Sequence, residues 1–526
     1  MDSRTSNGVK NIISGVGIKL FLLIFQFASK TLFVKYLDAY LGINSLLSSA
    51  LSYLNITELG IGTAINFAMY KPIADNDTEK ISQYIKYYKE IYHILGFITI
   101  SLGVLIAFIM PYLFDINELS FGYKEIYIIY VLYVVNACFG YFVFPARGGF
   151  LAASQKEYKL TVINFVGSIV SILLQLVAMM LCGKSFLSFV LYTAIPIIVS
   201  VIQRFWSGIC IEKWHPQIKI KPSGVLLREE KKNLYKNTFG LAIEKICVIM
   251  NNSVDGIIIS ALIGISILGK YSLYYTIISL VGGFTSVMFS SLAPSIGNLN
   301  SVGSTNQKKS VFDELYCISV WVHGFCAISY CVIIQPFMVV WAGEDKLLNC
   351  VVPITIGLNF LLGGMTSAVT GFRNGCGLYY RGRYRPIVYT ILNVILSLSI
   401  GRFLSMQFGE VWGIVGIVSA TIISRMAITW WFDAYIVFKD IIMENCKTYL
   451  IRYLLDFFAI VVAGTIVYVL CLSLSGLNPW IQILLMCIIC VFLVNGLMWI
   501  ILHRSPGFKS AKNRVYTVIK HIYRSK

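Results

Sequence analysis

Long, nearly uncharged apolar runs follow one another from end to end of this sequence. A membrane-spanning helix needs about 20 mainly apolar residues, and by that measure we predict about fourteen spans. Because every backbone polar group must find a partner inside hydrocarbon, the runs are expected to be α-helices, and the alternation of a β-barrel is absent. The predicted spans are 10–36, 41–70, 88–114, 124–152, 158–183, 186–211, 235–263, 269–297, 313–341, 347–378, 384–405, 411–438, 450–474 and 480–503.

The composition supports the same class. Hydrophobic residues make up 57% of the 526 residues and charged residues only 13%, whereas a soluble protein carries about a quarter charged residues. We therefore predict an integral membrane protein. The 13 cysteines lie mostly inside apolar runs, away from histidines. Even Cys487 and Cys490, which have C-x-x-C spacing, are interpreted as small buried hydrophobic residues, so neither a metal site nor a cofactor is predicted.

The distribution of basic residues predicts the orientation of the spans. The formal net charge is +18, and Lys and Arg concentrate in segments on the side of the N-terminus, above all in 212–236, 379–386 and 504–526. Basic loops stay in the cytoplasm, so both termini are predicted to be cytoplasmic. No soluble domain is available to present these residues to nucleic acid. No loop is large enough for a soluble active site either, which argues against a membrane glycan polymerase or ligase.

An internal repeat relates the two halves of the chain. Several short matches occur in the same order at offsets of about 222–229 residues. Six predicted spans separate the copies, so both halves have the same orientation. Parallel repeats of this kind form two lobes that open to either side of the membrane in turn. The matches are 41–46 with 268–273, Pro72 with Pro294, Asn136 with Asn359, Gly140 with Gly363 and Arg147 with Arg373.

The repeat defines the predicted organisation of the chain. We expect an all-α membrane protein with two parallel six-helix lobes and two further C-terminal helices around a central cavity. The predicted segments are an N-terminal lobe over 1–211, a cytoplasmic basic linker over 212–234, a C-terminal lobe over 235–438, two helices within 439–503 and a cytoplasmic basic tail over 504–526.

Polar and cationic residues inside the predicted spans are candidate cavity residues, because they are costly at membrane depth. Lys19, Gln26 and Lys30 are spaced by steps that return to one helix face, and this cationic stripe suits an anionic substrate. Snorkelling towards the membrane surface is the alternative for Lys30, and snorkelling or a structural cap is the alternative for the two arginines named next. The remaining candidates are Asn136 and Arg147 on the fourth span and Asn359 and Arg373 on the tenth.

A second set contains acidic residues. Glu58 on the second span, and Asn251 with Asp255 on the seventh, are candidates for coupling or gating. The alternative is a structural ion pair between helices. A further set lies near predicted cytoplasmic ends and is assigned to membrane topology: Arg204, Arg425, Asp433 and Asp456.

Two segments carry a resemblance to a known family. The run Glu58-Leu-Gly-Ile-Gly-Thr-Ala-Ile65, followed by Tyr70-Lys-Pro-Ile-Ala74, closely resembles the second-span signature of Wzx-type polysaccharide flippases. Asn251-Asn-Ser-Val-Asp255 and Leu268-Gly-Lys-Tyr-Ser272 are similar to later parts of the same pattern. These flippases form the polysaccharide transporter branch of the multidrug/oligosaccharidyl-lipid/polysaccharide (MOP) exporter superfamily.

The resemblance implies a function in the bacterial inner membrane. The expected activity is translocation of an undecaprenyl-pyrophosphate-linked oligosaccharide from the cytoplasmic to the outer leaflet, for cell-surface polysaccharide synthesis. The headgroup would occupy the cationic cavity while the polyprenyl tail stays among membrane lipids. The expected partners are this lipid-linked oligosaccharide and the polysaccharide polymerase machinery, H⁺ or Na⁺ is an expected coupling ion, and no enzyme activity is expected.

Two related functions stay open at this point. A lipid II flippase shares fourteen spans and a cationic cavity, although the Glu58–Ala74 signature argues against it. A cation-coupled multidrug exporter of the same superfamily typically has twelve spans and a more acidic cavity.

Overall fold

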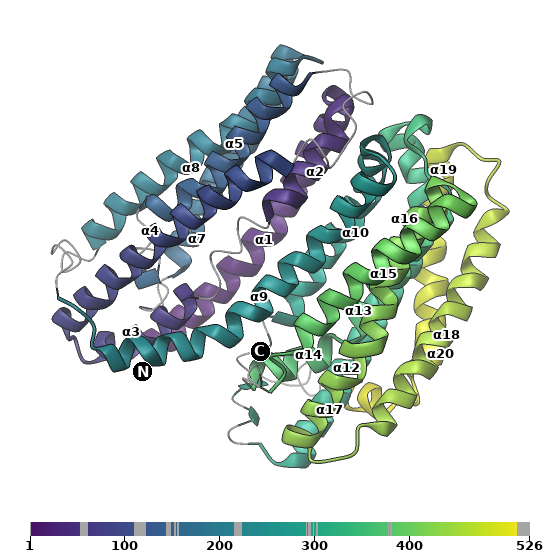
Figure 1. The fold of residues 1–526 in the computed structure, drawn as a ribbon. Coiled ribbons are helices and arrows are strands. Elements are labelled where there is room, and N and C mark those ends of the chain that lie inside the picture. Colours follow the sequence, from purple (N-terminus) through teal and green to yellow (C-terminus); the bar gives the residue numbers. More distant parts are fainter. Residues whose placement is uncertain are drawn as a thin grey trace, which may run out of the picture. The chain divides into compact units, whose positions relative to one another are not determined.

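The structure is a computed structural model whose regular secondary structure is helical in all the residues it describes. These residues confirm the predicted all-α class. The chain divides into two compact units, Met1–Gly269 and Lys270–Lys526, whose helices are labelled in Figure 1. The described residues are 2–52, 61–109, 122–143, 149–151, 154, 157–214, 224–290, 292, 296–297, 299–300, 303–376, 378 and 381–512.

The first unit is built from packed helices. Among the described residues, α1 packs on α7, α7 on α8, α4 on α5 and α5 on α8, while α9 packs on α2 and α3. The helices are α1 (Asp2–Tyr36), α2 (Leu41–Ser52), α3 (Ile61–Ala74), α4 (Thr78–Ile109), α5 (Tyr123–Phe142), α7 (Glu157–Cys182), α8 (Phe186–Trp214), α9 (Arg228–Leu262) and the first residues of α10 (Ile265–Ser290).

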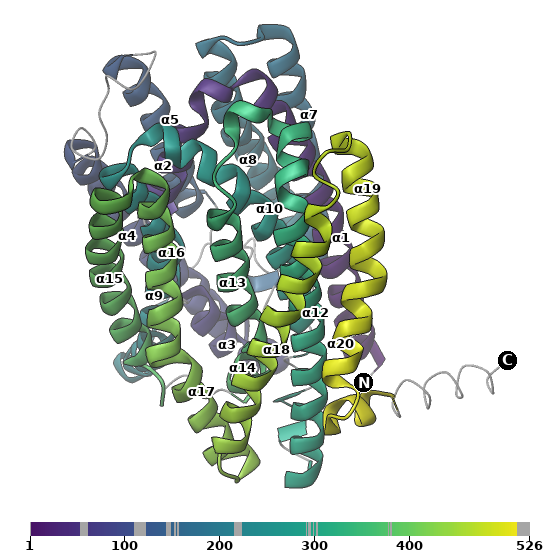
Figure 2. The same ribbon diagram turned by 90° about the vertical axis from the view of Figure 1, so that its right-hand side faces the viewer.

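The second unit contains the rest of α10 and a bundle around α12. Figure 2 shows α15 beside α16, and α18 and α20 near α12. Two short π-helical turns interrupt the twelfth span. The helices are α12 (Thr305–Ala342), α13 (Val351–Met365), α14 (Ser367–Gly375), α15 (Arg385–Phe408), α16 (Glu410–Ser424), η7 (Arg425–Thr429), α17 (Trp430–Val437), η8 (Phe438–Ile442), α18 (Lys447–Leu472), α19 (Pro479–Ile489), η9 (Cys490–Val494) and α20 (Asn495–Leu502).

Ten helical segments within the described residues are long and apolar enough to cross a membrane, or eleven if the bent pair of α13 and α14 is one span. All eleven coincide with predicted spans. The predicted spans 10–36, 41–70 and 235–263 are not among them: α1, α2 with α3, and α9 lie there, and parts of each fall outside the described residues. The count of fourteen spans stays a prediction.

The seventh predicted span, α9, lies in the first unit, where it contacts α2 and α3. The contact is made by small side chains. The Ser52 and Ser253 hydroxyls are hydrogen-bonded, and a Cβ at Gly256 would lie 2.6 Å from Ser49 Oγ. Close approach through small residues is typical of membrane helices. The predicted lobe boundaries at 211, 235 and 438 are not tested by this division and stay predictions.

Local sequence signals explain several helix ends in the second unit. Ser304 and Gln307 form a reciprocal capping box at the start of α12, which satisfies two backbone donors that the helix itself cannot. Pro386 occupies the first turn of α15, where no donor is required. Gly409, with φ +92°, separates α15 from α16, because glycine adopts this conformation without steric cost.

The crossing of α15 and α16 gives a first testable prediction. A Cβ at Gly416 would lie 2.9 Å from the Ile400 carbonyl oxygen and 3.1 Å from Gly401 Cα. We expect Gly416→Val to lower the free energy of unfolding by about 1–3 kcal/mol through overpacking. Thermal unfolding of the detergent-purified protein measures this effect. Gly496→Ala is the matched control, since no atom lies within 4 Å of its Cβ position. Equal midpoints for the two variants would contradict the predicted contact.

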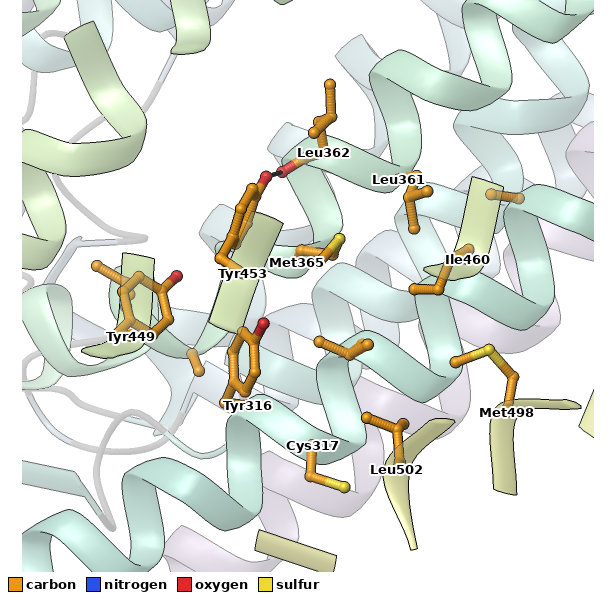
Figure 3. Packing of buried hydrophobic residues seen from close by; sticks show 14 of the residues in the cluster. Tyr316, Cys317, Leu361, Leu362, Met365, Tyr449, Tyr453, Ile460, Met498 and Leu502 are labelled. Atoms are coloured by element: carbon orange, nitrogen blue, oxygen red, sulfur yellow. Dashed lines mark hydrogen bonds between the residues drawn. The ribbon is translucent and has the colours of Figure 1, made fainter. Parts of the chain in front are cut away.

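The core of the second unit joins the C-terminal helices to the rest of this unit. Tyr316 and Cys317 of α12 pack against Tyr449 and Tyr453 of α18, and α20 adds Met498 to the same cluster (Figure 3). The Tyr453 hydroxyl donates a hydrogen bond of 2.9 Å to the Leu362 carbonyl oxygen. The pair predicted as an addition to the repeat is therefore integrated into the core of this unit.

Candidate functional site

In the first unit, the signature segment packs on tyrosines of α4. The Tyr88 and Tyr92 rings stack with centroids 4.4 Å apart, and the Tyr88 hydroxyl donates to the Tyr92 hydroxyl at 3.1 Å. A Cβ at Gly62 would lie 2.7 and 2.6 Å from these two oxygens. Gly62 therefore makes room for a buried tyrosine pair. Close by, the Asn66 side-chain oxygen is buried without a hydrogen-bond partner among the described residues.

Lys30 is the cation of the predicted stripe that the structure places. It is partly buried on α1, and its Nζ lies 5.2 Å from the centroid of the Phe33 ring. Phe33 itself is fully buried against Phe189 and Tyr192 of α8. Within the described part of the chain, no carboxylate forms an ion pair with Lys30. Gln26 is exposed, and the side chain of Lys19 lies outside the described residues.

The acidic candidates are placed only in part. Asn251 and Asp255 are partly buried on α9. The Asn251 side-chain oxygen has no hydrogen-bond partner among the described residues. Glu58 lies outside the described residues, and so does Arg147 of the cationic set.

In the second unit, the tenth span is broken. The axes of α13 and α14 differ by 41° at Thr366. Breaks of this kind leave backbone carbonyls without helical donors. Side chains of three other helical segments and of Thr366 supply donors here: Arg425 Nη1 to Asn359 O (2.7 Å), Tyr453 Oη to Leu362 O (2.9 Å), Thr366 Oγ1 to Gly363 O (2.7 Å) and Ser319 Oγ to Gly364 O (2.6 Å).

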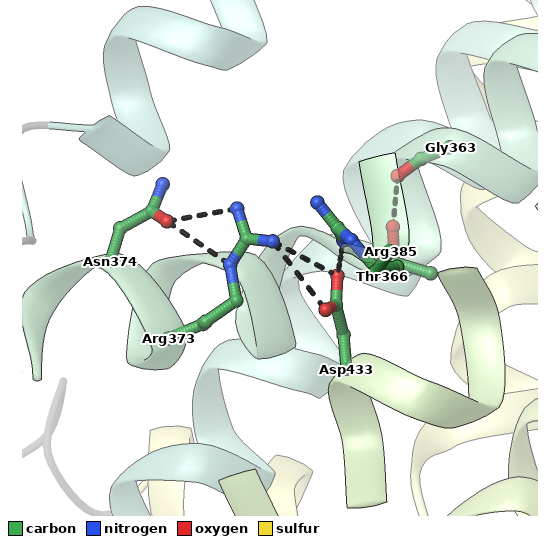
Figure 4. Close-up of polar contacts among 6 residues, drawn as sticks. All are labelled: Gly363, Thr366, Arg373, Asn374, Arg385 and Asp433. Carbon is green, nitrogen blue, oxygen red and sulfur yellow. Dashed lines mark hydrogen bonds and ion pairs between the residues drawn. The ribbon is translucent and has the colours of Figure 1, made fainter. Parts of the chain in front are cut away.

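Beyond the break, two arginines share one aspartate. Arg373 Nη1 lies 3.4 Å from both carboxylate oxygens of Asp433, and Arg385 forms a second ion pair with the same carboxylate. Arg373 also donates to the Asn374 side-chain oxygen at 3.2 and 3.3 Å. Figure 4 shows the four side chains converging. Asp433 is 4% exposed and Arg373 5%, so the charges are held away from solvent.

The structure therefore separates the predicted residues of the tenth span. Asn359 lies before the break, with its side-chain oxygen buried and without a partner among the described residues. Arg373 lies after it, in the ion pair with Asp433, which favours the structural alternative for this residue. Asn136, the predicted counterpart of Asn359 in the first half of the repeat, is exposed on α5.

Sequence reasoning gave Arg204, Arg425 and Asp433 only a topological role, and the structure adds specific contacts for all three. The sequence pattern did not predict His323, which is 3% exposed on α12. Its ring lies between the rings of Phe289 and Phe360, and its Nδ1 is 2.8 Å from the Ser319 carbonyl oxygen. A single histidine in an apolar run has no spaced partner in the sequence that would mark it as a site residue. In the described part of the chain, no three His, Cys, Asp or Glu residues gather as potential metal ligands.

More than half of the chain matches the model of one protein family. Residues 9–300 match the model of the family described as polysaccharide biosynthesis protein. The chain belongs to this family. The match contains the signature segment 58–74 and the segment 251–272, on which the resemblance to polysaccharide flippases was based. Comparison with curated protein sequences gives no match.

Solved structures share the fold of this polysaccharide biosynthesis family member. The lipid II flippase MurJ in an inward closed conformation is 14% identical, with a TM-score of 0.64 over 92% of this chain and 97% of that one. An inward-facing multidrug resistance MATE family transporter is 11% identical, with a TM-score of 0.61 over 81% and 98%. A MOP superfamily transporter from Pyrococcus furiosus is 12% identical, with a TM-score of 0.52 over 82% and 96%.

These findings support the predicted superfamily. The family member has the fold of MOP superfamily transporters and is an integral membrane protein with multiple membrane-spanning helices. The proteins that share the fold are transporters and flippases, which agrees with the prediction that the chain is not an enzyme.

Proposed function

We propose that this protein is a flippase for an undecaprenyl-pyrophosphate-linked oligosaccharide repeat unit. It would move the unit from the cytoplasmic to the outer leaflet of the bacterial inner membrane by alternating access, for cell-surface polysaccharide synthesis. Both termini lie in the cytoplasm in this proposal. The polymerase machinery would then receive the translocated unit.

The family match carries the proposal. Proteins of polysaccharide biosynthesis that have a transporter fold and no large soluble domain act on membrane-bound intermediates rather than on soluble sugars. The segment 58–74 lies within the match and resembles the signature of polysaccharide flippases. The fold is shared with a lipid II flippase, so a lipid-linked glycan is a cargo of suitable chemistry.

The charge of the first unit supports an anionic headgroup. Lys30 is partly buried on α1 next to Phe33, and no carboxylate ion pair accompanies it among the described residues. An uncompensated cation at membrane depth is costly unless a ligand or water accompanies it. A pyrophosphate would supply the opposite charge, whereas a cationic drug would be repelled.

The energy source is part of the proposal. Coupling to H⁺ or Na⁺ would use Glu58 and Asp255, with Asn251 as a neighbouring ligand one helical turn from Asp255. One elementary charge crossing 100 mV contributes about 2.3 kcal/mol, which suffices to bias a two-state equilibrium by more than tenfold. Flipping by proteoliposomes with Na⁺, H⁺ or no gradient tests this step.

Deletion of the gene in its host tests the proposed function. Undecaprenyl-linked glycans are extracted and identified by mass, and surface polysaccharide is scored in parallel. We expect complete lipid-linked repeat units to accumulate in the cytoplasmic leaflet while surface polymer is lost. Accumulation of lipid II instead would favour the lipid II flippase alternative, and sensitivity to cationic dyes with normal surface polymer would favour the multidrug exporter. Normal delivery of completed units in a strain without a redundant transporter would refute the proposal.

A further inference from the structure

In both units an arginine guanidinium lies over a glycine of a neighbouring helix and donates to a backbone carbonyl of that helix. In the first unit, Arg204 Nη1 of α8 donates to the Gly140 carbonyl oxygen of α5 at 3.4 Å. In the second unit, Arg425 Nη1 donates to the Asn359 carbonyl oxygen of α13 at 2.7 Å, and its guanidinium lies over Gly363. Gly363 follows Gly140 by 223 residues and Arg425 follows Arg204 by 221, which agrees with the offset of the sequence repeat.

In both units a side chain at the glycine position would meet the guanidinium. A Cβ at Gly140 would lie 2.8 Å from Arg204 Nη2, and a Cβ at Gly363 would lie 3.1 Å from Arg425 Cζ and closer still to its Nη1. These distances are shorter than ordinary van der Waals contact. Glycine at both positions allows the planar guanidinium to lie directly on the helix backbone, where a larger residue would displace it.

Both glycines lie two residues before the end of their helix: α5 ends at Phe142 and α13 at Met365. Arg204 donates to one of the last carbonyls of α5, which is favourable because these groups carry partial negative charge. Arg425 donates to Asn359 O, six residues before the end of α13. The twelfth span thus holds α13 through Arg425 and α14 through Asp433, on opposite sides of the break.

The sequence of the sixth span repeats the spacing of these two charges. Glu212 follows Arg204 by eight residues, as Asp433 follows Arg425 by eight. None of these four residues belongs to the segments 58–74 and 251–272, which carry the resemblance to polysaccharide flippases. The spacing of these two charges is therefore shared by both halves of the repeat.

We propose that Arg204 and Arg425 are a matched pair of positioning residues that fix the fourth and tenth spans within their units. Each guanidinium ties α5 or α13 to the neighbouring span, so that each unit moves as one body during transport. The structural part of this proposal rests on the contacts alone. Its consequence for transport rests on the proposed function.

The test is a pair of double-mutant cycles, Gly363→Ala with Arg425→Ala and Gly140→Ala with Arg204→Ala. In proteoliposomes we expect each single variant to flip the lipid-linked oligosaccharide about tenfold more slowly, a factor that corresponds to about 1.4 kcal/mol. Each double variant is expected to be no slower than its arginine variant, because the alanine methyl group then has no guanidinium to displace. Arg425→Lys keeps the positive charge on a shorter side chain and should recover part of the rate.

Affinity separates positioning from substrate contact. Native mass spectrometry should give affinities of the single variants for the lipid-linked oligosaccharide within about threefold of the unmodified protein, less than 1 kcal/mol. Gly371→Ala and Arg402→Ala are the controls: Ile296 Cδ1, at 3.5 Å, is the nearest atom to a Cβ at Gly371, and Arg402 is exposed on α15. Both should flip at the normal rate.

Three results would overturn the proposal: a normal rate for Gly363→Ala, multiplied losses in the double variants, or affinity falling as far as the rate. If the unmodified protein does not flip this substrate, the proposed function fails. The contacts of Arg204 and Arg425 are then tested by hydrogen exchange. Amide exchange over 359–366 should then rise in Arg425→Ala and in Gly363→Ala, and no further in the double variant. Unchanged exchange in Arg425→Ala would overturn the proposal independently of transport.

Discussion

Asp433→Ala is expected to lower the free energy of unfolding by about 3–5 kcal/mol, the range found when one partner of a buried ion pair is removed. The Asp433 carboxylate is almost fully buried and accepts from both Arg373 and Arg385, whose side chains are 6% and 10% exposed. Removal of the carboxylate would take the shared ion-pair partner away from two buried guanidinium groups. The midpoint of thermal unfolding of the detergent-purified protein measures the loss.

The exposed pair of Lys309 and Glu444 is the matched control. Their side chains are 43% and 41% exposed, so Glu444→Ala is expected to cost only about 0–1 kcal/mol. A compensated variant, Asp433→Leu with Arg373→Met and Arg385→Met, should recover much of the loss, because apolar groups of similar volume replace a buried ion cluster at little cost. An Asp433→Ala protein that unfolds at the normal midpoint would contradict the burial of these charges.

Lys30→Gln is expected to reduce flipping of a lipid-linked oligosaccharide by at least about tenfold. A cation about 4 Å from a phosphate oxygen contributes about 4 kcal/mol at an effective dielectric constant of 20, far more than the 1.4 kcal/mol that a tenfold change requires. Glutamine removes the charge and keeps a polar side chain that is one atom shorter. Lys30→Arg, which keeps the charge, should retain most of the activity.

Restoration of surface polysaccharide in the deletion strain, followed by flipping in proteoliposomes, measures this effect. Lys35→Gln is the matched control, because Lys35 is exposed in the last turn of the same helix, next to the Tyr36 ring. We expect normal activity from it. Equal activity of Lys30→Gln and the unmodified protein would remove Lys30 from the proposed substrate site, and equal losses at both positions would indicate a general effect on α1.

Most of the fold follows from hydrophobic run lengths. The run 313–341 lies within α12, and all but the last two residues of 450–474 lie within α18, because a stretch of this length and composition has one stable state in lipid. The run 347–378 also passes this measure, yet it contains a break at Thr366. Hydropathy does not report a bend that side chains of Ser319, Tyr453 and Arg425 stabilise from other helices.

The candidate site followed from the sequence only where single residues are informative. Lys30 is predicted from its position inside a predicted span; the structure places it partly buried on α1 beside Phe33, and its role in a cavity stays a prediction. Arg373 was predicted on the same grounds, but its partner Asp433 is 60 residues away, on a different span. Side-chain spacing along one helix cannot identify such a partner, since pairing depends on which helices are neighbours and how they are rotated.

The sequence by itself determined the class of the protein, its helical segments and the repeat that relates its halves, because the cost of placing backbone and charge in hydrocarbon acts on each segment separately. Tertiary structure alone decided which charges are paired, where the tenth span breaks and which side chains lie against Gly62, Gly140 and Gly363. Each of these depends on atoms brought together from distant parts of the chain, at distances that a single missing or added methyl group changes.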